Sequence, residues 1–104
     1  MEFLAYWELN ENMPEQERLS IANKLMESGL FPPEGVTIFR WDSTPDLWGT
    51  LIFEADTAEQ AQRTLNVWRS AGAGFFKFTK MAPSMPVQDV IPISANIQEA
   101  LGSA

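Results

Sequence analysis

Apolar residues recur along the chain with two different spacings, and these spacings predict its secondary structure. Short aromatic and β-branched runs at residues 2–9, 36–42, 47–55 and 75–81 are typical of strands. Two further sets of apolar residues recur at helical spacing: Leu19, Ala22, Leu25 and Met26, and Ala58, Ala61, Leu65 and Trp68. The pattern therefore predicts the order strand, helix, strand, strand, helix, strand.

Local signals place the ends of the first helix. Asn12 and Glu15 have the spacing of a capping box, and Pro14 is tolerated only in a first turn. Gly29 is expected to end the helix, because a left-handed residue costs least at glycine.

The second helix has its own start signals. Thr57 with Gln60, or Asp56 with Glu59, has capping-box spacing, and Gly72 follows the last periodic residue. The turn-forming Ser-Thr-Pro-Asp at residues 43–46 separates two strands that are expected to pair as an antiparallel hairpin.

This order predicts an α+β fold of the ferredoxin-like βαββαβ type over residues 1–82, with a four-stranded antiparallel sheet and two helices on one face. Residues 83–104 form a proline-containing tail. Within this tail, Ser94 is a helix-capping residue type and Gly102 is expected to close a short amphipathic helix. So short a helix is expected to dock on its own domain or on a partner subunit.

Both faces of the predicted sheet are apolar, although two helices can cover only one. In residues 47–55, the helix-packed face is expected to hold Leu47, Leu51, Phe53 and Ala55. The outer face is expected to hold Trp48, Thr50, Ile52 and Glu54, together with Tyr6 and Trp41. An exposed patch of this kind usually marks a contact surface, so we expect a homodimer through the outer face.

Several motifs together resemble an uncharacterised bacterial family of small proteins with a domain of unknown function. They are "RWDS" after the second strand, "FEADTAEQA" leading into the second helix, Trp68 late in that helix, and "FFKFTKMAP" ending in proline. The resemblance covers nearly the whole chain. It implies a relationship to the dimeric α+β barrels, in which the sheets of two subunits pack face to face.

That wider superfamily includes cofactor-free monooxygenases, isomerases, haem enzymes and ligand-binding modules, so the fold does not choose among them. A histidine often follows the Arg-Trp pair in the smaller family, whereas this chain has Asp42. The resemblance therefore does not extend to a function that depends on an imidazole there.

Composition excludes several kinds of site. The chain has no cysteine and no histidine, which removes disulfides, thiolate chemistry and the commonest metal ligand and general base. Neither a nucleotide-binding glycine motif nor ligand-spaced acidic residues are found, so we expect no metal and no cofactor. A net charge of −7 argues against nucleic acid and anionic membranes as partners. With neither a signal-peptide pattern nor an apolar run of about 18 residues, a cytoplasmic location is expected.

Seven residues near the strand ends are candidates for ligand binding: Arg40, Trp41, Asp42, Trp7, Trp48, Glu8 and Glu54. Arg40 offers a guanidinium that binds a carboxylate bidentately, with Trp7 or Trp48 as an aromatic wall. A carboxylate near tryptophan has the environment of a general base. The structural alternatives are that Arg40 stacks or pairs at a strand end, and that Lys77 pairs with Glu8.

Two functions follow from these features. A non-catalytic homodimeric module that binds a small molecule or a protein is favoured, because the side chains best suited to acid-base and nucleophilic work are absent. The alternative is a cofactor-free enzyme, monooxygenase-like or isomerase-like, that acts on a small aromatic or carbonyl substrate in a pocket between sheet and helices.

Overall fold

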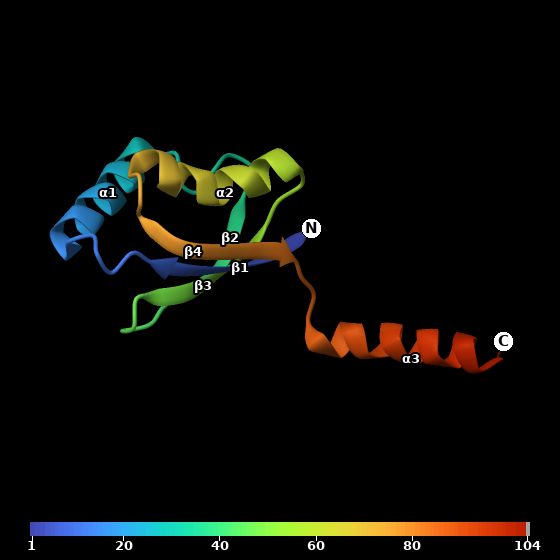
Figure 1. Ribbon diagram of the computed structural model, residues 1–104. Helices are drawn as coiled ribbons and strands as arrows, with labels where there is room; N and C mark the ends of the chain where they lie inside the picture. The colour runs from blue at the N-terminus through green and yellow to red at the C-terminus, as the bar shows by residue number, and fades with distance from the viewer. Residues whose placement is uncertain (104) are drawn as a thin grey trace.

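The computed structural model describes residues 1–103 of the chain. Its elements are β1 (Glu2–Leu9), α1 (Glu15–Ser28), β2 (Thr37–Ser43), β3 (Trp48–Glu54), α2 (Ala58–Ala71), β4 (Phe76–Pro83) and α3 (Val87–Ser103). The predicted βαββαβ order is confirmed (Figure 1). No helix among these residues has both the length and the apolar character that crossing a membrane requires.

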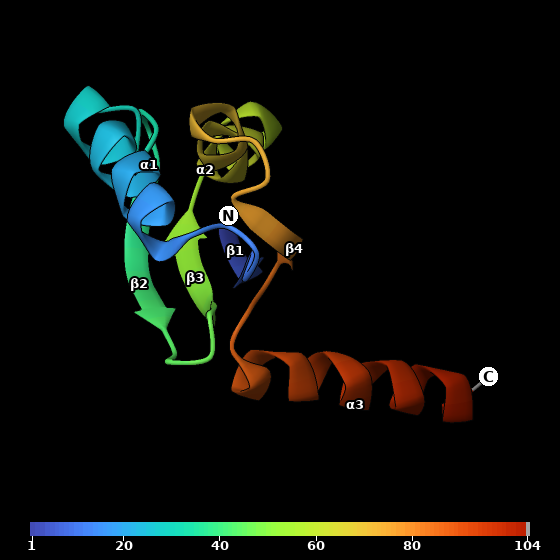
Figure 2. The ribbon, with the colours of Figure 1, turned by 60° about the vertical axis from the view of Figure 1, so that its left-hand side comes forward.

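The four strands form one antiparallel sheet in the order β2-β3-β1-β4, so β2 and β4 are its edges. Helices α1 and α2 lie together on one side of the sheet, and α3 lies on the other side and points away from the domain (Figures 1 and 2). The sheet face away from α1 and α2 is called the outer face below.

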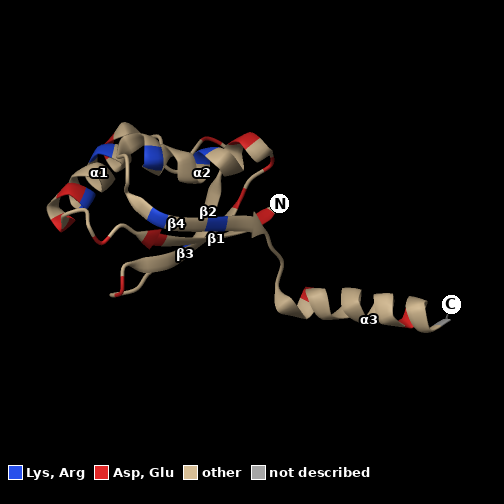
Figure 3. Cartoon of the chain, in the orientation of Figure 1, with Lys and Arg blue, Asp and Glu red and all other residues tan. Residues whose placement is uncertain are grey.

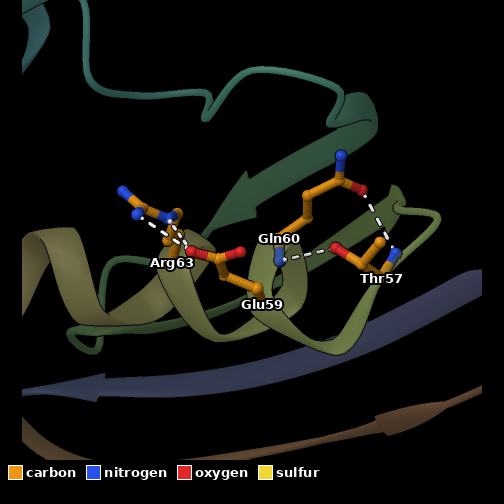
Figure 4. A network of polar contacts seen from close by, with 4 residues as sticks. All are labelled: Thr57, Glu59, Gln60 and Arg63. Carbon is orange, nitrogen blue, oxygen red and sulfur yellow. Dashed lines mark hydrogen bonds and ion pairs between the residues drawn. The ribbon is translucent and has the colours of Figure 1, made fainter.

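Helix α2 begins at a complete capping box. The Thr57 hydroxyl accepts a hydrogen bond from the Gln60 backbone N–H at 3.2 Å, and the Gln60 side chain accepts one from the Thr57 N–H at 3.2 Å (Figure 4). The same side chain also accepts from the Asp56 N–H at 2.8 Å. Of the two predicted start signals, Thr57 with Gln60 is therefore the one that forms, and the helix ends just before Gly72 as expected.

Helix α1 differs from the prediction in two respects. Its N-cap is Pro14 with no side-chain cap, so the box predicted at Asn12 does not form, although the helix ends at a left-handed Gly29 as predicted. Its buried residues are Ile21 and Leu25, whereas Leu19 and Met26 are exposed. Residues 19, 21, 25 and 26 offer two overlapping apolar stripes, and contact with the sheet selects the one that runs through Ile21.

The core lies between the sheet and the helices. On β3 the predicted helix-packed residues Leu51 and Phe53 are buried, as is Ala55 just after the strand. Trp48 is exposed on the opposite face. The predicted facing of β3 is thus confirmed, except that Leu47 lies in the preceding turn with a left-handed φ of 64°.

The predicted position of Trp41 on the outer face is wrong. The register of β2 against β3 shifts between Ile38 and Arg40, so Trp41 lies opposite Leu51 and on the helix-covered side. One extra residue in an edge strand reverses the facing of every residue after it.

Helix α3 is longer than predicted. It begins at Val87, after Pro86, whose carbonyl accepts hydrogen bonds from the Asp89 and Val90 N–H groups, and it runs through Pro92 and Gly102. Every side chain described between Val87 and Gly102 is exposed. Docking of this helix on its own domain, one of the two predicted alternatives, is therefore excluded.

Candidate functional site

A cavity of about 270 Å³ lies between the helix-covered face of the sheet and the two helices. All four strands contribute its floor, and α1, α2 and the segments before β2 and β4 contribute its walls. It is lined by Trp7, Leu9, Ala22, Phe31, Trp41, Ser43, Leu51, Leu65, Trp68, Phe75 and Phe76. Its place between sheet and helices is the one expected for a ligand pocket.

Aromatic rings dominate the lining of this cavity. Trp68 is at the centre of the array, with ring centroids 5.2 Å from Phe31, 5.6 Å from Trp41 and 5.2 Å from Phe75, which stacks on it. Trp41 and Phe31 are also in contact, at 5.1 Å. These distances are those of favourable edge-to-face and offset-stacked pairs, so the walls are held in place by contacts among themselves. Trp41 is 44% exposed and lies at the rim.

Trp7 provides a polar group to the cavity wall. Its side chain is only 7% exposed, and its indole Nε1 has no hydrogen-bond partner among the described residues. The indole lies close against Gly49 of β3, where a Cβ atom would collide with it. A glycine at this position therefore allows the ring to lie flat on the neighbouring strand. A buried N–H without a partner is costly.

The remaining lining residues restrict the chemistry of the site. Ser43 is the other residue with a polar side chain, and none of the lining residues ionises near neutral pH. A cavity with flat aromatic walls and one buried donor suits an uncharged, planar molecule that carries a hydrogen-bond acceptor.

The structure divides the seven predicted candidate residues between the two faces of the sheet. Trp7 and Trp41 line the cavity. The register of the strands places the other five on the outer face: Arg40, Asp42, Trp48, Glu8 and Glu54. Arg40 and Trp7, one of its two predicted wall residues, therefore lie on opposite faces of the sheet, whereas Trp48, the other, lies on the same face as Arg40.

Sequence reasoning missed much of the cavity wall. Phe31, Phe75 and Phe76 were not among the candidates, and Trp68 was predicted only as a core residue of α2. The sequence did offer one signal. Phe31 is followed by two prolines and Phe75 follows a glycine, so both lie in connections between helices and strands.

The outer face carries a second group of aromatic residues, centred on Tyr6. The Tyr6 ring lies 5.8 Å from Trp48 and 6.1 Å from Phe78, and the Lys80 ammonium lies 5.4 Å from its centre. Apolar Leu4, Ile52 and Ala82 form the next row toward the other end of the strands. Loss of hydration and the negative charge of nearby Glu8 raise the pKa of the Tyr6 phenol. This face therefore has an apolar, aromatic centre, and neither α1 nor α2 covers it.

Charged residues lie on the strands as well as on the helices (Figure 3). Arg40 Nε lies 2.5 Å from Asp42 Oδ2, with side-chain exposures of 73% and 50%. Such an exposed pair is typical of a structural surface contact. The predicted pairing of Lys77 with Glu8 is wrong, because Lys77 Nζ lies 3.2 Å from Glu11 Oε1. Glu8 instead lies between Trp48 and Phe78 on neighbouring strands.

The ion pair with Lys77 affects the acidity of Glu11. Hydrogen bonding to the backbone N–H of Glu11 and the ammonium of Lys77 lower the pKa of the Glu11 carboxyl. Within residues 1–103 we find no cluster of acidic side chains that would hold a metal ion.

Comparison with known proteins adds a likeness of overall shape. The chain is similar to a protein from Nitrosomonas europaea named "Putative antibiotic biosynthesis monooxygenase", at 14% identity and a TM-score of 0.48, over 82% of this chain and 98% of the other. No protein-family model matches the chain. No curated protein matches it either. The resemblance to the small uncharacterised family therefore stays a prediction.

Proposed function

We propose that the protein is a homodimeric binding module, whose cavity between sheet and helices holds a small, uncharged, planar molecule with a hydrogen-bond acceptor. The observation that carries the proposal is the buried Trp7 Nε1, which has no partner among the described residues and belongs to a residue that lines a cavity rich in aromatic rings. Stacking on the indole and phenyl walls contributes affinity, and the indole N–H orients the ligand.

The lining of the cavity favours binding over catalysis. Acid-base catalysis needs a titratable group within hydrogen-bond reach of the substrate. The ionisable candidates Glu8, Glu54 and Tyr6 lie on the outer face of the sheet, away from the cavity. The alternative of a cofactor-free enzyme would require the ligand itself, or a group from elsewhere, to supply the reactive proton.

The outer face supports the homodimer. Trp48 and Phe78 are 39% and 49% exposed and, with Tyr6, span three adjacent strands. Basic Lys80 and acidic Glu8 lie on the same face, so two copies related by a twofold axis can bring opposite charges together. Burying several such side chains at about 1.5 to 3 kcal/mol each couples association to folding.

Binding is tested with matched ligands. The probe is 2-acetylnaphthalene, which is flat and uncharged and has one carbonyl acceptor. Its controls are 2-isopropylnaphthalene, which lacks the acceptor, and naphthalene-2-carboxylate, which is charged. We expect the ketone to bind most tightly by titration calorimetry or tryptophan quenching.

The variant Trp7→Phe keeps the aromatic wall and removes the donor. It is expected to weaken ketone binding by about two- to tenfold, the worth of one net hydrogen bond. Binding of the isopropyl compound is expected to stay the same. Tightest binding of the carboxylate, no measurable binding of any naphthalene, or an equal loss for both neutral ligands would contradict the proposal.

A further inference from the structure

Helix α3 has an exposed apolar stripe that the domain does not cover. At 3.6 residues per turn, six apolar side chains fall on one side: Val87, Val90, Ile91, Ile93, Ile97 and Leu101. Asp89, Asn96 and Glu99 fall on the other side. Pro92 also lies on the polar side. Because proline has no backbone N–H, the carbonyl one turn before it has no helical partner, and on this side it can bond to water. All six apolar side chains are exposed.

The size of the chain shows how much surface this leaves open. Its accessible surface is 7146 Å², whereas a compact monomer of this mass exposes roughly 5,900 Å². Its radius of gyration is 17.2 Å, against about 13 Å for a compact domain of about 100 residues. The excess surface is larger than the roughly 800 Å² that each partner contributes to a typical stable interface. The area is therefore sufficient for a second copy of the chain.

Symmetry indicates where a second copy meets the helix. Helix α3 leaves the edge strand β4 at Pro83 and lies on the outer-face side of the sheet (Figures 1 and 2). If two outer faces stack about a twofold axis parallel to the strands, the β4 edge of one copy lies over the β2 edge of the other. Pro83 of β4 pairs with Phe3 of β1. At the same end of the sheet, Glu2 of β1 pairs with Glu54 of β3, which in turn pairs with Thr37 of β2. The β4 end of one copy then meets the start of β2 in the second.

The edge strand β2 presents an apolar surface at that place. Phe39, at the bulge, is 54% exposed, and Trp41 is 44% exposed at the rim of the cavity. A helix of 17 residues is about 25 Å long, which is enough to follow the whole of β2 once the connection at residues 84–86 turns it back over the sheet of the second copy.

From these observations we infer that α3 is an arm exchanged between two copies, whose apolar stripe packs on Phe39 and Trp41 of the second copy. The inference rests on the proposed homodimer and adds to it. Each arm then places aliphatic side chains at the rim of the other copy's cavity, so the binding site is completed by both subunits. A helix that is marginally stable when isolated gains a partner for its apolar side.

Cysteine cross-linking tests the inference, because the natural chain has no cysteine. Phe39→Cys and Ile97→Cys are prepared as two single-cysteine chains of different mass, mixed until subunits exchange, and treated with a short bismaleimide. A product that contains one chain of each kind joins two subunits by construction. Asn96→Cys is the matched control, since it lies next to Ile97 in sequence but on the polar side of α3. Light scattering on the untreated wild-type chain is run in parallel.

We expect a mixed product with Ile97→Cys at a yield at least fivefold above that with Asn96→Cys. If the wild-type chain is a dimer but the two yields are equal, or no mixed product forms, the arm is wrong and the homodimer stands. If the wild-type chain is a monomer, the homodimer fails and the arm fails with it. A cross-link formed within one chain that carries both Phe39→Cys and Ile97→Cys would also overturn the inference.

Discussion

The two faces of the sheet are built from the same four strands, yet their apolar residues are covered in different ways. On β3, Phe53 is completely buried beneath the helices, whereas Trp48 is 39% exposed on the outer face. The helix-covered face satisfies its apolar residues within the chain and still leaves a cavity. The outer face has a comparable aromatic group with nothing over it. An apolar strand residue therefore does not by itself show how it is covered: on one face the helices of the same chain cover it, and on the other face neither α1 nor α2 does.

The largest expected effect separates two tryptophans on opposite faces. Trp68→Ala removes the ring that Phe31, Trp41 and Phe75 pack against, and is expected to lower the free energy of unfolding by about 3 to 5 kcal/mol. Chemical denaturation of the variant and the wild-type chain at the same protein concentration measures this loss.

Trp48→Ala is the comparison, because it removes a ring from the outer face. Its destabilisation is expected to be smaller, because the ring is already 39% exposed in the single chain and loses only contacts between subunits. A loss of the same size for both variants would make the two faces equivalent and contradict the comparison.

The next effect concerns Ile52, in the middle of the outer face. Ile52→Asp places a charge without a partner in the proposed interface and is expected to give monomers, or unfolded chain, at micromolar concentration. Ile52→Val is the control and is expected to remain a dimer. Sedimentation of both variants checks this, and a well-folded Ile52→Asp dimer would show that the outer face is not the interface.

A smaller effect is expected on the arm. Ile97→Glu and Asn96→Glu add the same charge to adjacent positions of α3, on the apolar and the polar side. Only Ile97→Glu is expected to weaken the dimer. Its dissociation constant should rise by about tenfold, because the interface loses the burial of one apolar side chain of this size. Equal dissociation constants for the two variants, measured by dilution, would remove the apolar stripe from the interface.

Arg40→Ala should have the smallest effect. Its pair with Asp42 is exposed at both ends, so we expect a change in unfolding free energy below about 1 kcal/mol. The sequence predicted that this arginine is either a structural contact or an anion anchor. Binding of naphthalene-2-carboxylate that is lost in Arg40→Ala would assign it to ligand binding.

How far the sequence predicts this structure depends on what fixes each feature. Periodicity and caps predict the six elements of the domain, the Thr57 capping box and the two faces of β3, because these depend on neighbouring residues. The position of Trp41 could not be predicted, since it depends on a bulge that only the pairing with β3 defines.

The tail and the cavity show the same limit. Pro92 was expected to precede the last helix, but Pro86 supplies the start, and Pro92 lies on the polar side where its cost is low. The cavity joins residues from four strands, two helices and two connections. Their meeting is a property of the packed fold, so the glycine- and proline-containing connections beside Phe31 and Phe75 mark the ends of elements but not the cavity that these residues line.

The homodimer through the outer face is the central claim, and the molar mass of the wild-type chain tests it most directly. Light scattering coupled to size-exclusion chromatography at micromolar concentration should give twice the 11.7 kDa mass of one chain. On dilution, loss of the dimer should coincide with loss of folded structure, because the exposed rings would again face water. A well-folded species with the mass of one chain at micromolar concentration would contradict the claim.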